Sequence, residues 1–188
     1  MKPLLLAATM ACVFGCQKPK PPEQIADEVV KQLTKRVRPL DTSKNPPALP
    51  FPKNPPQQPN LAKVKQLSAE ITSLKIKDLV VGAGPAVKPG SSITVHYVGK
   101  LPDGYIFDTS YKDKGTPFTF KYDNYDPAKP TVIRGWIEGL RGMRVGGRRE
   151  LTIPASLAYG ASPPLGAPIP PNAALLFDIQ LLFVYGGA

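Results

Sequence analysis

The sequence has very little of the chemistry on which metal and thiol sites depend. It contains two cysteines and one histidine among 188 residues. Both cysteines, Cys12 and Cys16, lie near the N-terminus, so the rest of the chain can form neither a disulfide nor a thiolate metal site. A lone histidine, His96, cannot build a histidine cluster for zinc. We therefore expect a fold without disulfides and a site that uses no metal and no other cofactor.

A targeting segment is the first feature that the sequence does contain. Lys2 precedes an apolar run from Leu4 to Gly15. The run is shorter than the roughly 20 residues that a membrane-spanning helix requires, and its length is typical of a secretory signal. These observations predict a signal peptide at residues 1–15.

Cys16 follows this segment directly. Val13-Phe14-Gly15-Cys16 resembles a bacterial lipobox, in which the cysteine is acylated and becomes the first mature residue, although Phe14 replaces the usual small residue. The resemblance implies membrane attachment through Cys16, because two or more acyl chains anchor a protein stably. The residue after it is Gln17 rather than Asp, which by the rule for bacterial lipoproteins implies the outer membrane of the cell envelope. We expect the protein to face the periplasm. Cleavage without lipidation is the alternative.

Residues 16–60 are rich in proline and in positive charge. Eleven of the 24 prolines lie between Gln17 and Asn60, and residues 17–77 carry 12 Lys and Arg against five Asp and Glu. Closely spaced prolines exclude helix and central strand, so we expect an extended tether. Its charge suits an anionic surface such as phospholipid headgroups or cell-wall polymers, or serves solvation alone. Nucleic acid is not expected as a partner after a secretion signal.

A possible short helix interrupts this tether at residues 23–38. Four apolar residues recur at every fourth position, with acids at the start and bases at the end, as a helix dipole prefers. These apolar residues are Ile25, Val29, Leu33 and Val37. The stripe could pack on a partner, on a second copy or on a membrane surface, or it could remain without a partner.

Residues 61–188 have the pattern of one β-rich domain. Apolar and polar residues alternate over 93–98, 150–153 and 177–183, which predicts strands with one buried face. Trp136 to Met143 is the one segment with a convincing short-helix pattern. Strands around one short helix favour an α+β fold. His96 lies on the strand face opposite Tyr97, so we interpret it as a surface residue rather than a catalytic one.

A series of short motifs is more specific than these patterns. In chain order they are Val95–Gly99, Asp103-Gly104, Phe107-Asp108, Val132–Gly139 (VIRGWIEG), Leu157–Gly160, Ile169–Pro171 and Leu176–Asp178. Within VIRGWIEG, Gly135 marks an expected tight turn before the helix. In this order the motifs resemble the FKBP-type peptidyl-prolyl cis-trans isomerases over roughly Leu74 to Val184. The resemblance implies a bent antiparallel β-sheet wrapped around one short α-helix, preceded here by the proline-rich tether.

The implied reaction is rotation of the peptide bond before proline. Its barrier of about 18–20 kcal/mol reflects lost amide resonance, so a catalyst needs no nucleophile but a dry, shaped pocket that prefers the twisted amide. The resemblance implies five catalytic residues, namely Tyr97, Asp108, Ile133, Trp136 and Tyr159. It implies five further residues that bind substrate, namely Phe107, Phe118, Val132, Ile169 and Phe177.

Within this set the resemblance implies individual roles. Trp136 is the floor under the prolyl ring, and Asp108 orients and polarises the site. The Ile133 backbone N–H and the Tyr159 hydroxyl each meet a substrate carbonyl. The implied partners are proline-containing polypeptides and macrolide inhibitors such as rapamycin.

Three departures from the family pattern stand out. The stretch 111–116 lacks the usual Arg that pairs with the pocket Asp, and Lys112, Asp113 and Lys114 lie there instead. The segment between Phe118 and Val132 is about five residues longer than the compact pattern and is expected near the pocket rim. The flap from Ser162 to Pro171 is rich in proline, with Ile169 expected to keep its apolar contact and Leu165 replacing a polar residue.

Three functions are compatible with these residues. The first is an isomerase that is tethered to the envelope and acts on exported proteins. The second is a non-catalytic module of the same fold that holds client chains in its apolar pocket. The third is a structural adaptor whose basic tail binds envelope polymers.

Overall fold

A computed structural model of the protein describes residues 55–112 and 115–186, which belong to one unit of the chain. The predicted signal peptide, Cys16 and the possible helix at 23–38 lie outside the described residues, as does most of the tether at 16–60. Our statements about those segments therefore stay predictions.

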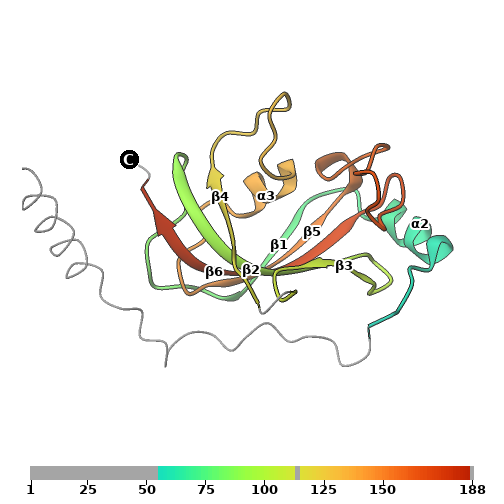
Figure 1. Ribbon diagram of the computed structural model, residues 1–188, viewed down its shortest axis with the longest axis horizontal. Coiled ribbons are helices and arrows are strands. Elements are labelled where there is room, and N and C mark those ends of the chain that lie inside the picture. Colours follow the sequence, from blue (N-terminus) through green and yellow to red (C-terminus); the bar gives the residue numbers. More distant parts are fainter. Residues whose placement is uncertain (1–54, 113–114, 187–188) are drawn as a thin grey trace, which may run out of the picture. The chain divides into compact units, whose positions relative to one another are not determined.

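Six strands form one antiparallel sheet (Figure 1). They are β1 (Lys75–Val80), β2 (Ser91–Lys100), β3 (Ile106–Thr109), β4 (Phe118–Tyr122), β5 (Arg148–Ile153) and β6 (Leu175–Tyr185). The order is β1-β5-β6-β2-β3, and β4 also pairs with β2. The long strands β2 and β6 form the centre of the sheet, and their pairing runs from Ser92↔Tyr185 to Lys100↔Leu176. The three predicted strands are confirmed as parts of β2, β5 and β6.

The sheet bends around the short helix α3 (Arg134–Gly139), as Figure 1 shows. Apolar side chains of the helix and of the three central strands fill the space between the two layers. The buried members of this core include Trp136, Ile137 and Leu140 from the helix region, and Ile93, Val95, Leu151, Ile153, Ile179 and Leu181 from the strands. The predicted α+β architecture, with a bent antiparallel sheet over a short helix, is confirmed.

Two glycines set the distance between α3 and the sheet. A Cβ atom added at Gly135 would lie 2.4 Å from Ile153 Cγ2, and one at Gly139 would lie 2.6 Å from Leu151 Cδ1. Both neighbours belong to β5 and are fully buried. Gly135 was expected to form a tight turn, but it lies inside the helix and is required there for close packing.

Polar contacts hold the same helix at its C-terminal end. The buried Arg149 side chain of β5 donates Nη1–H to the carbonyl of Gly139 at 2.7 Å, and it forms a two-pronged ion pair with Asp78 of β1 at 2.7 and 3.0 Å. The buried Tyr122 hydroxyl donates to the Ile137 carbonyl at 2.6 Å. These partners satisfy carbonyls that a helix end leaves without an intrahelical donor.

The helix also has different bounds from those expected from the sequence. It starts at Arg134 rather than Trp136 and ends at Gly139 rather than Met143. The expected extension fails at Gly142, which adopts a positive φ of 69° that ends regular helix. Leu140 and Met143 are nevertheless buried, so the apolar periodicity reflected the core correctly.

A second helix, α2 (Leu61–Glu70), precedes the sheet and was not predicted. Only Val64 and Ser68 of its ten residues are buried, so the contact that docks it includes one polar residue and gives little apolar signal. Asn60 caps its start by accepting the N–H of Lys63 at 3.1 Å, and Ser68 Oγ accepts the N–H of Ala174 at 2.9 Å. Within residues 55–112 and 115–186, no helix has both the length and the apolar character that a membrane crossing needs.

The close approach at Gly135 gives a stability prediction. Gly135→Ala is expected to destabilise the domain by about 1–3 kcal/mol, because overpacking a tight core site forces neighbours to shift and the β-branched Ile153 is stiff. Chemical denaturation monitored by the fluorescence of Trp136 measures this change. Glu138→Ala is the matched control, since within the described residues the Glu138 side chain makes only an exposed ion pair with Arg134, and the substitution should change stability by about 0.5 kcal/mol or less. Equal effects of the two substitutions would contradict the packing role of Gly135.

Candidate active site

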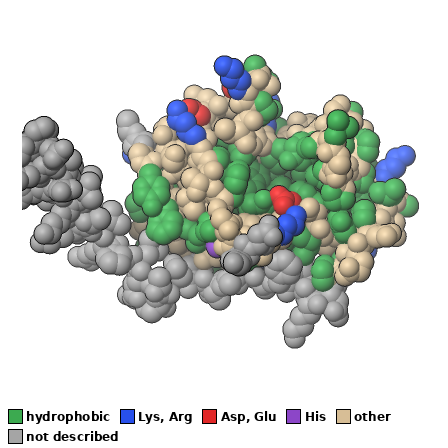
Figure 2. Space-filling model, in the orientation of Figure 1, with side chains coloured by type: hydrophobic (Ala, Val, Ile, Leu, Met, Phe, Trp, Pro, Cys, Tyr) green, Lys and Arg blue, Asp and Glu red, His purple; other side chains and the backbone are tan. Residues whose placement is uncertain are grey.

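A cavity of about 230 Å³ opens between α3 and the bent sheet. Figure 2 shows hydrophobic side chains lining a hollow in this face, with acidic and basic side chains meeting at its edge. The lining residues come from four strands, the start of α3 and two loops. They are Tyr97, Phe107, Asp108, Phe118, Thr131, Val132, Ile133, Trp136, Tyr159 and Phe177.

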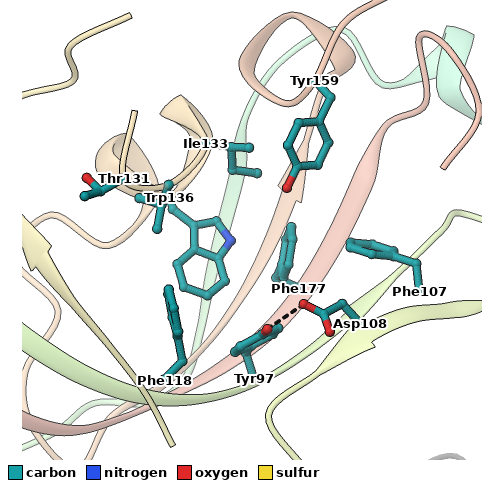
Figure 3. A pocket seen from close by; sticks show the side chains of 10 residues that line it. Tyr97, Phe107, Asp108, Phe118, Thr131, Ile133, Trp136, Tyr159 and Phe177 are labelled. Atoms are coloured by element: carbon teal, nitrogen blue, oxygen red, sulfur yellow. Dashed lines mark hydrogen bonds between the residues drawn. The ribbon is translucent and has the colours of Figure 1, made fainter. Parts of the chain in front are cut away.

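Trp136 is the centre of the aromatic part of this cavity. Its ring stands edge-on to Tyr97 at a centroid distance of 5.3 Å, to Phe177 at 5.2 Å and to Phe118 at 6.3 Å. Figure 3 shows these rings grouped around the indole, with Phe107 beyond Phe177. Such edge-to-face pairs are favourable beyond their buried area, by about 0.5–1.5 kcal/mol each. The result is a rigid apolar bowl.

One carboxylate faces the bowl among the lining residues. Asp108 Oδ2 accepts a hydrogen bond of 2.5 Å from the Tyr97 hydroxyl, drawn as the dashed line in Figure 3. Burial raises the pKa of Asp108, but hydrogen bonds from Tyr97 and Lys112 outweigh it, and the pKa lies below the ordinary value. Burial, together with the same hydrogen bond and the Asp108 charge, raises the pKa of the Tyr97 hydroxyl well above its usual range. Asp108 is therefore ionised and Tyr97 protonated at neutral pH.

A break in the edge of the sheet places Tyr97 and Asp108 together. β4 pairs with β2 up to Val95 and β3 pairs with it from Val98 onward, so the middle of β2 has no strand partner on this edge. The residues after Asp108 bind this part of β2. Ser110 Oγ accepts the Tyr97 N–H at 2.9 Å, while the Tyr97 carbonyl accepts from Thr109 Oγ1 at 2.9 Å and from the Ser110 backbone N–H at 3.1 Å. The residues after Asp108 thus fix the backbone of the tyrosine that binds Asp108.

Lys112 pairs with Asp108 in the stretch where the family pattern usually has an arginine. Its Nζ lies 3.1 Å from Asp108 Oδ1, four residues along the chain. Both side chains are about half exposed, at 57% and 45%. The ion pair that the sequence left in doubt is therefore formed by a lysine, and its strength should depend on salt because the pair is solvated.

Three polar hydrogens lie at the walls of the bowl. The Ile133 N–H precedes the first turn of α3 and has no hydrogen-bond acceptor among the residues that the structure describes. The Tyr159 hydroxyl points into the cavity in Figure 3, and burial, reinforced by the Asp108 charge, raises its pKa. The indole N–H of Trp136 is buried and likewise has no partner within the described part of the chain. Donors are thus available on an otherwise apolar surface.

Nine of the ten pocket residues expected from the sequence line this cavity. The exception is Ile169, which is buried in the flap and is not among the lining residues. Thr131 lines the cavity but was not expected, and only its place beside Val132 in the sequence could have indicated it. Leu165 of the flap is fully exposed. The predicted lipidation residue, Cys16, lies outside the described residues.

His96 lies behind the bowl rather than in it. Its Nδ1 is 3.0 Å from Ser110 Oγ, and its ring stacks on Tyr111 at a centroid distance of 4.6 Å. It is half-buried rather than fully on the surface, and burial lowers its pKa. The histidine supports the segment that carries Asp108.

Comparisons with known proteins agree on one family. Residues 84–182 match the family model of the FKBP-type peptidyl-prolyl cis-trans isomerases. FK506-binding protein 4 of Dictyostelium discoideum is 49% identical over 125 residues, which are 64% of this chain and 31% of the relative. The chain thus spans about a third of the length of this curated relative.

Solved bacterial structures are similar over more of their length. A peptidyl-prolyl cis-trans isomerase of Pseudomonas syringae pv. tomato has a TM-score of 0.53 and 31% identity, covering 70% of this chain and 99% of the other. FkpA of Escherichia coli has a TM-score of 0.55 and 30% identity, covering 91% of this chain and 76% of the other.

The contact between Lys112 and Asp108 gives a prediction on acidity. Lys112→Gln replaces the ammonium donor with a neutral, shorter amide, so the pKa of Asp108 is expected to rise from its lowered value. NMR titration of the Asp108 carboxyl carbon measures the change, with Lys121→Gln, which breaks the separate pair with Asp123, as the control. Because the folded pKa is depressed, the stability from this carboxylate is present above its unfolded pKa of about 3.9 and is lost as pH falls through the folded pKa. Lys112→Gln should shift this loss to higher pH, and an unchanged titration would contradict the role of Lys112.

Proposed function

The chain belongs to the FKBP-type peptidyl-prolyl cis-trans isomerases, and on that premise we propose that its aromatic bowl accelerates rotation of X-Pro bonds in polypeptides. The observation that carries the proposal is the combination of an indole floor ringed by Tyr97, Phe118 and Phe177 with an ionised Asp108 at the wall. A proline ring fits an apolar cavity of this kind, and the few polar groups are placed to orient the adjoining amides.

The proposed mechanism is preference for the twisted amide. Planarity of the X-Pro amide comes from resonance that separates charge between oxygen and nitrogen, and water stabilises that separation. A dry aromatic bowl withdraws this solvation. The planar amide, which is more charge-separated, loses more stabilisation than the twisted amide, so the barrier to rotation falls. No covalent bond to carbon forms or breaks, and none of the bowl residues has to act as a nucleophile.

We assign the polar groups to orientation. The Ile133 N–H, which lacks an acceptor among the described residues, is the proposed donor to one substrate carbonyl, and the protonated Tyr159 hydroxyl is the donor to another. Asp108 holds the Tyr97 ring through its hydroxyl and supplies a negative field at one wall. Phe107, Val132 and Phe177 then enclose the prolyl ring on the floor formed by Trp136. Ile169 has a supporting role in the flap rather than direct contact.

We propose proline-containing polypeptides as substrates and macrolides such as rapamycin as inhibitors. The chemistry shared by both is a saturated ring joined to a tertiary amide, which fills the bowl and offers carbonyl oxygens to its donors. FK506 appears in the name of the Dictyostelium relative, which supports this ligand class for a chain that is 49% identical to it.

The isomerase proposal is tested on a short X-Pro peptide. The purified protein is expected to accelerate cis-to-trans isomerisation, and rapamycin should block the acceleration. Asp108→Asn should lower kcat/KM by about 10- to 100-fold, the range expected for hydrogen bonds to a charged group. Glu150→Gln on β5, which breaks the exposed ion pair with Lys77 and lines neither the bowl nor its rim, is the control and should have little effect.

The outcomes of this test separate two functions. Absence of acceleration for several different residues before proline would overturn the isomerase. Binding of unfolded chains that persists without any turnover would instead support a client-holding module that uses the same bowl.

We further propose that the protein is a lipoprotein of a bacterial cell envelope, anchored through Cys16 to the outer membrane and facing the periplasm. Support comes from the apolar run that ends at Gly15 and from the proline-rich, basic stretch after Cys16. Such a stretch would hold the isomerase domain away from the bilayer, where exported polypeptides are within reach.

The anchor is tested by substitution of either cysteine. In a bacterial host supplied with labelled palmitate, the parent protein is expected to incorporate label and to sediment with membranes. Cys16→Ser should lose both properties, because the acyl acceptor is gone. Cys12→Ser is the matched control, since Cys12 lies in the segment that is removed, and it should behave like the parent. Labelling of Cys16→Ser would contradict the anchor.

A further inference from the structure

A second cavity of about 220 Å³ adjoins the bowl. It lies under the segment between β4 and α3, which projects from the domain in Figure 1 and is longer than the compact family pattern. The two cavities share Thr131 and Val132, so this pair forms a common wall. Figure 3 shows the Thr131 side chain directed away from the indole of Trp136, toward the outer side of that wall.

Four of the ten residues that line the second cavity are apolar or aromatic. Ile137 of α3 lies at its base and is buried, Val132 and Pro130 form one side, and Tyr125 is a partly exposed wall, at 38%. Aromatic and aliphatic surfaces in this arrangement favour an apolar guest.

Three of the four charged residues that line the cavity make contacts within or beside the segment itself. Asp123 pairs with Lys121 at 3.3 Å and accepts the N–H of Asn124, while Asp126 accepts the N–H of Ala128 at 2.9 Å. These contacts hold the turns of the segment, as aspartates commonly do. The lining contains two cations, Lys121 and Lys129, and two anions, Asp123 and Asp126. It therefore has no net charge to attract a charged ligand.

We infer that this cavity is a second subsite that takes an apolar side chain of the same substrate chain, a few residues from the proline, and that Tyr125 determines its preference. The inference rests on the proposed function, because the substrate must first be held in the bowl. An extended chain advances about 3.3 Å per residue, so a polypeptide that leaves the bowl across Thr131 and Val132 presents a nearby side chain to the second cavity.

The test compares X-Pro peptides that differ only in one flanking residue. Leu, Phe, Gly, Glu or Lys is placed two, three or four positions from the proline, on either side. At one of these positions, Leu or Phe is expected to raise kcat/KM about tenfold over Gly, which corresponds to partial burial of one apolar side chain. Glu and Lys should give no such gain.

Three substitutions test which part of the protein surface causes the preference for an apolar flanking residue. Tyr125→Ala should reduce the ratio of kcat/KM for the apolar and glycine peptides to about one. Tyr185→Ala removes an exposed tyrosine at the end of β6, and Leu165→Ala removes the exposed leucine of the flap; both should keep the ratio of the parent.

The glycine-flanked peptide separates failure of the inference from failure of the proposed function. Its turnover without any apolar preference overturns the second subsite and leaves the isomerase in place. A preference that survives Tyr125→Ala but disappears in Leu165→Ala also overturns it, since the flap would then be the contact. No turnover of any peptide overturns both.

Discussion

The close contact between α3 and β5 is the constraint on which the rest of the structure depends. Glycine at positions 135 and 139 lets the helix approach Ile153 and Leu151 more closely than any other residue would allow. Arg149 then ties the end of the helix to β1 through Asp78. A six-residue helix has little stability of its own, so these contacts, and not its intrinsic propensity, hold Trp136 in the bowl.

A second constraint acts on the opposite wall of the bowl. Because β2 changes partners between Val95 and Val98, its backbone at Tyr97 depends on Thr109 and Ser110. Those residues directly follow Asp108, so the same short stretch completes the sheet edge and delivers the carboxylate. The hydrogen bond between Tyr97 and Asp108 is therefore a consequence of how the strand edge is closed. Loss of the Thr109 or the Ser110 hydroxyl would therefore loosen the β2 backbone at Tyr97 and, with it, this wall of the bowl.

The sequence predicted well what depends on periodicity and on recognisable motifs. Alternation identified the central strands, and the motif series identified nine lining residues of the bowl. It failed where the deciding contact is tertiary. Helix α2 buries only Val64 and the polar Ser68, so the residues that dock it give little apolar signal. Gly135 has the same sequence signal in a turn as in a close-packed helix. The sequence also could not predict which lysine pairs with Asp108. Lys112 and Lys114 are equivalent candidates until the backbone brings one of them, Lys112, close to the carboxylate.

The floor of the bowl and its rim differ in how much sequence change they can accept, and this difference fits the chemistry of amide rotation. Rotation of an amide needs a rigid apolar bowl but no covalent intermediate, so the floor and its supports tolerate little change. The rim has no comparable demand. There a solvated lysine can hold the carboxylate, and a longer segment between β4 and α3 can enclose another cavity without disturbing Trp136. In the proposed isomerase, variation at the rim can therefore change which polypeptides are bound while the rotation step stays the same.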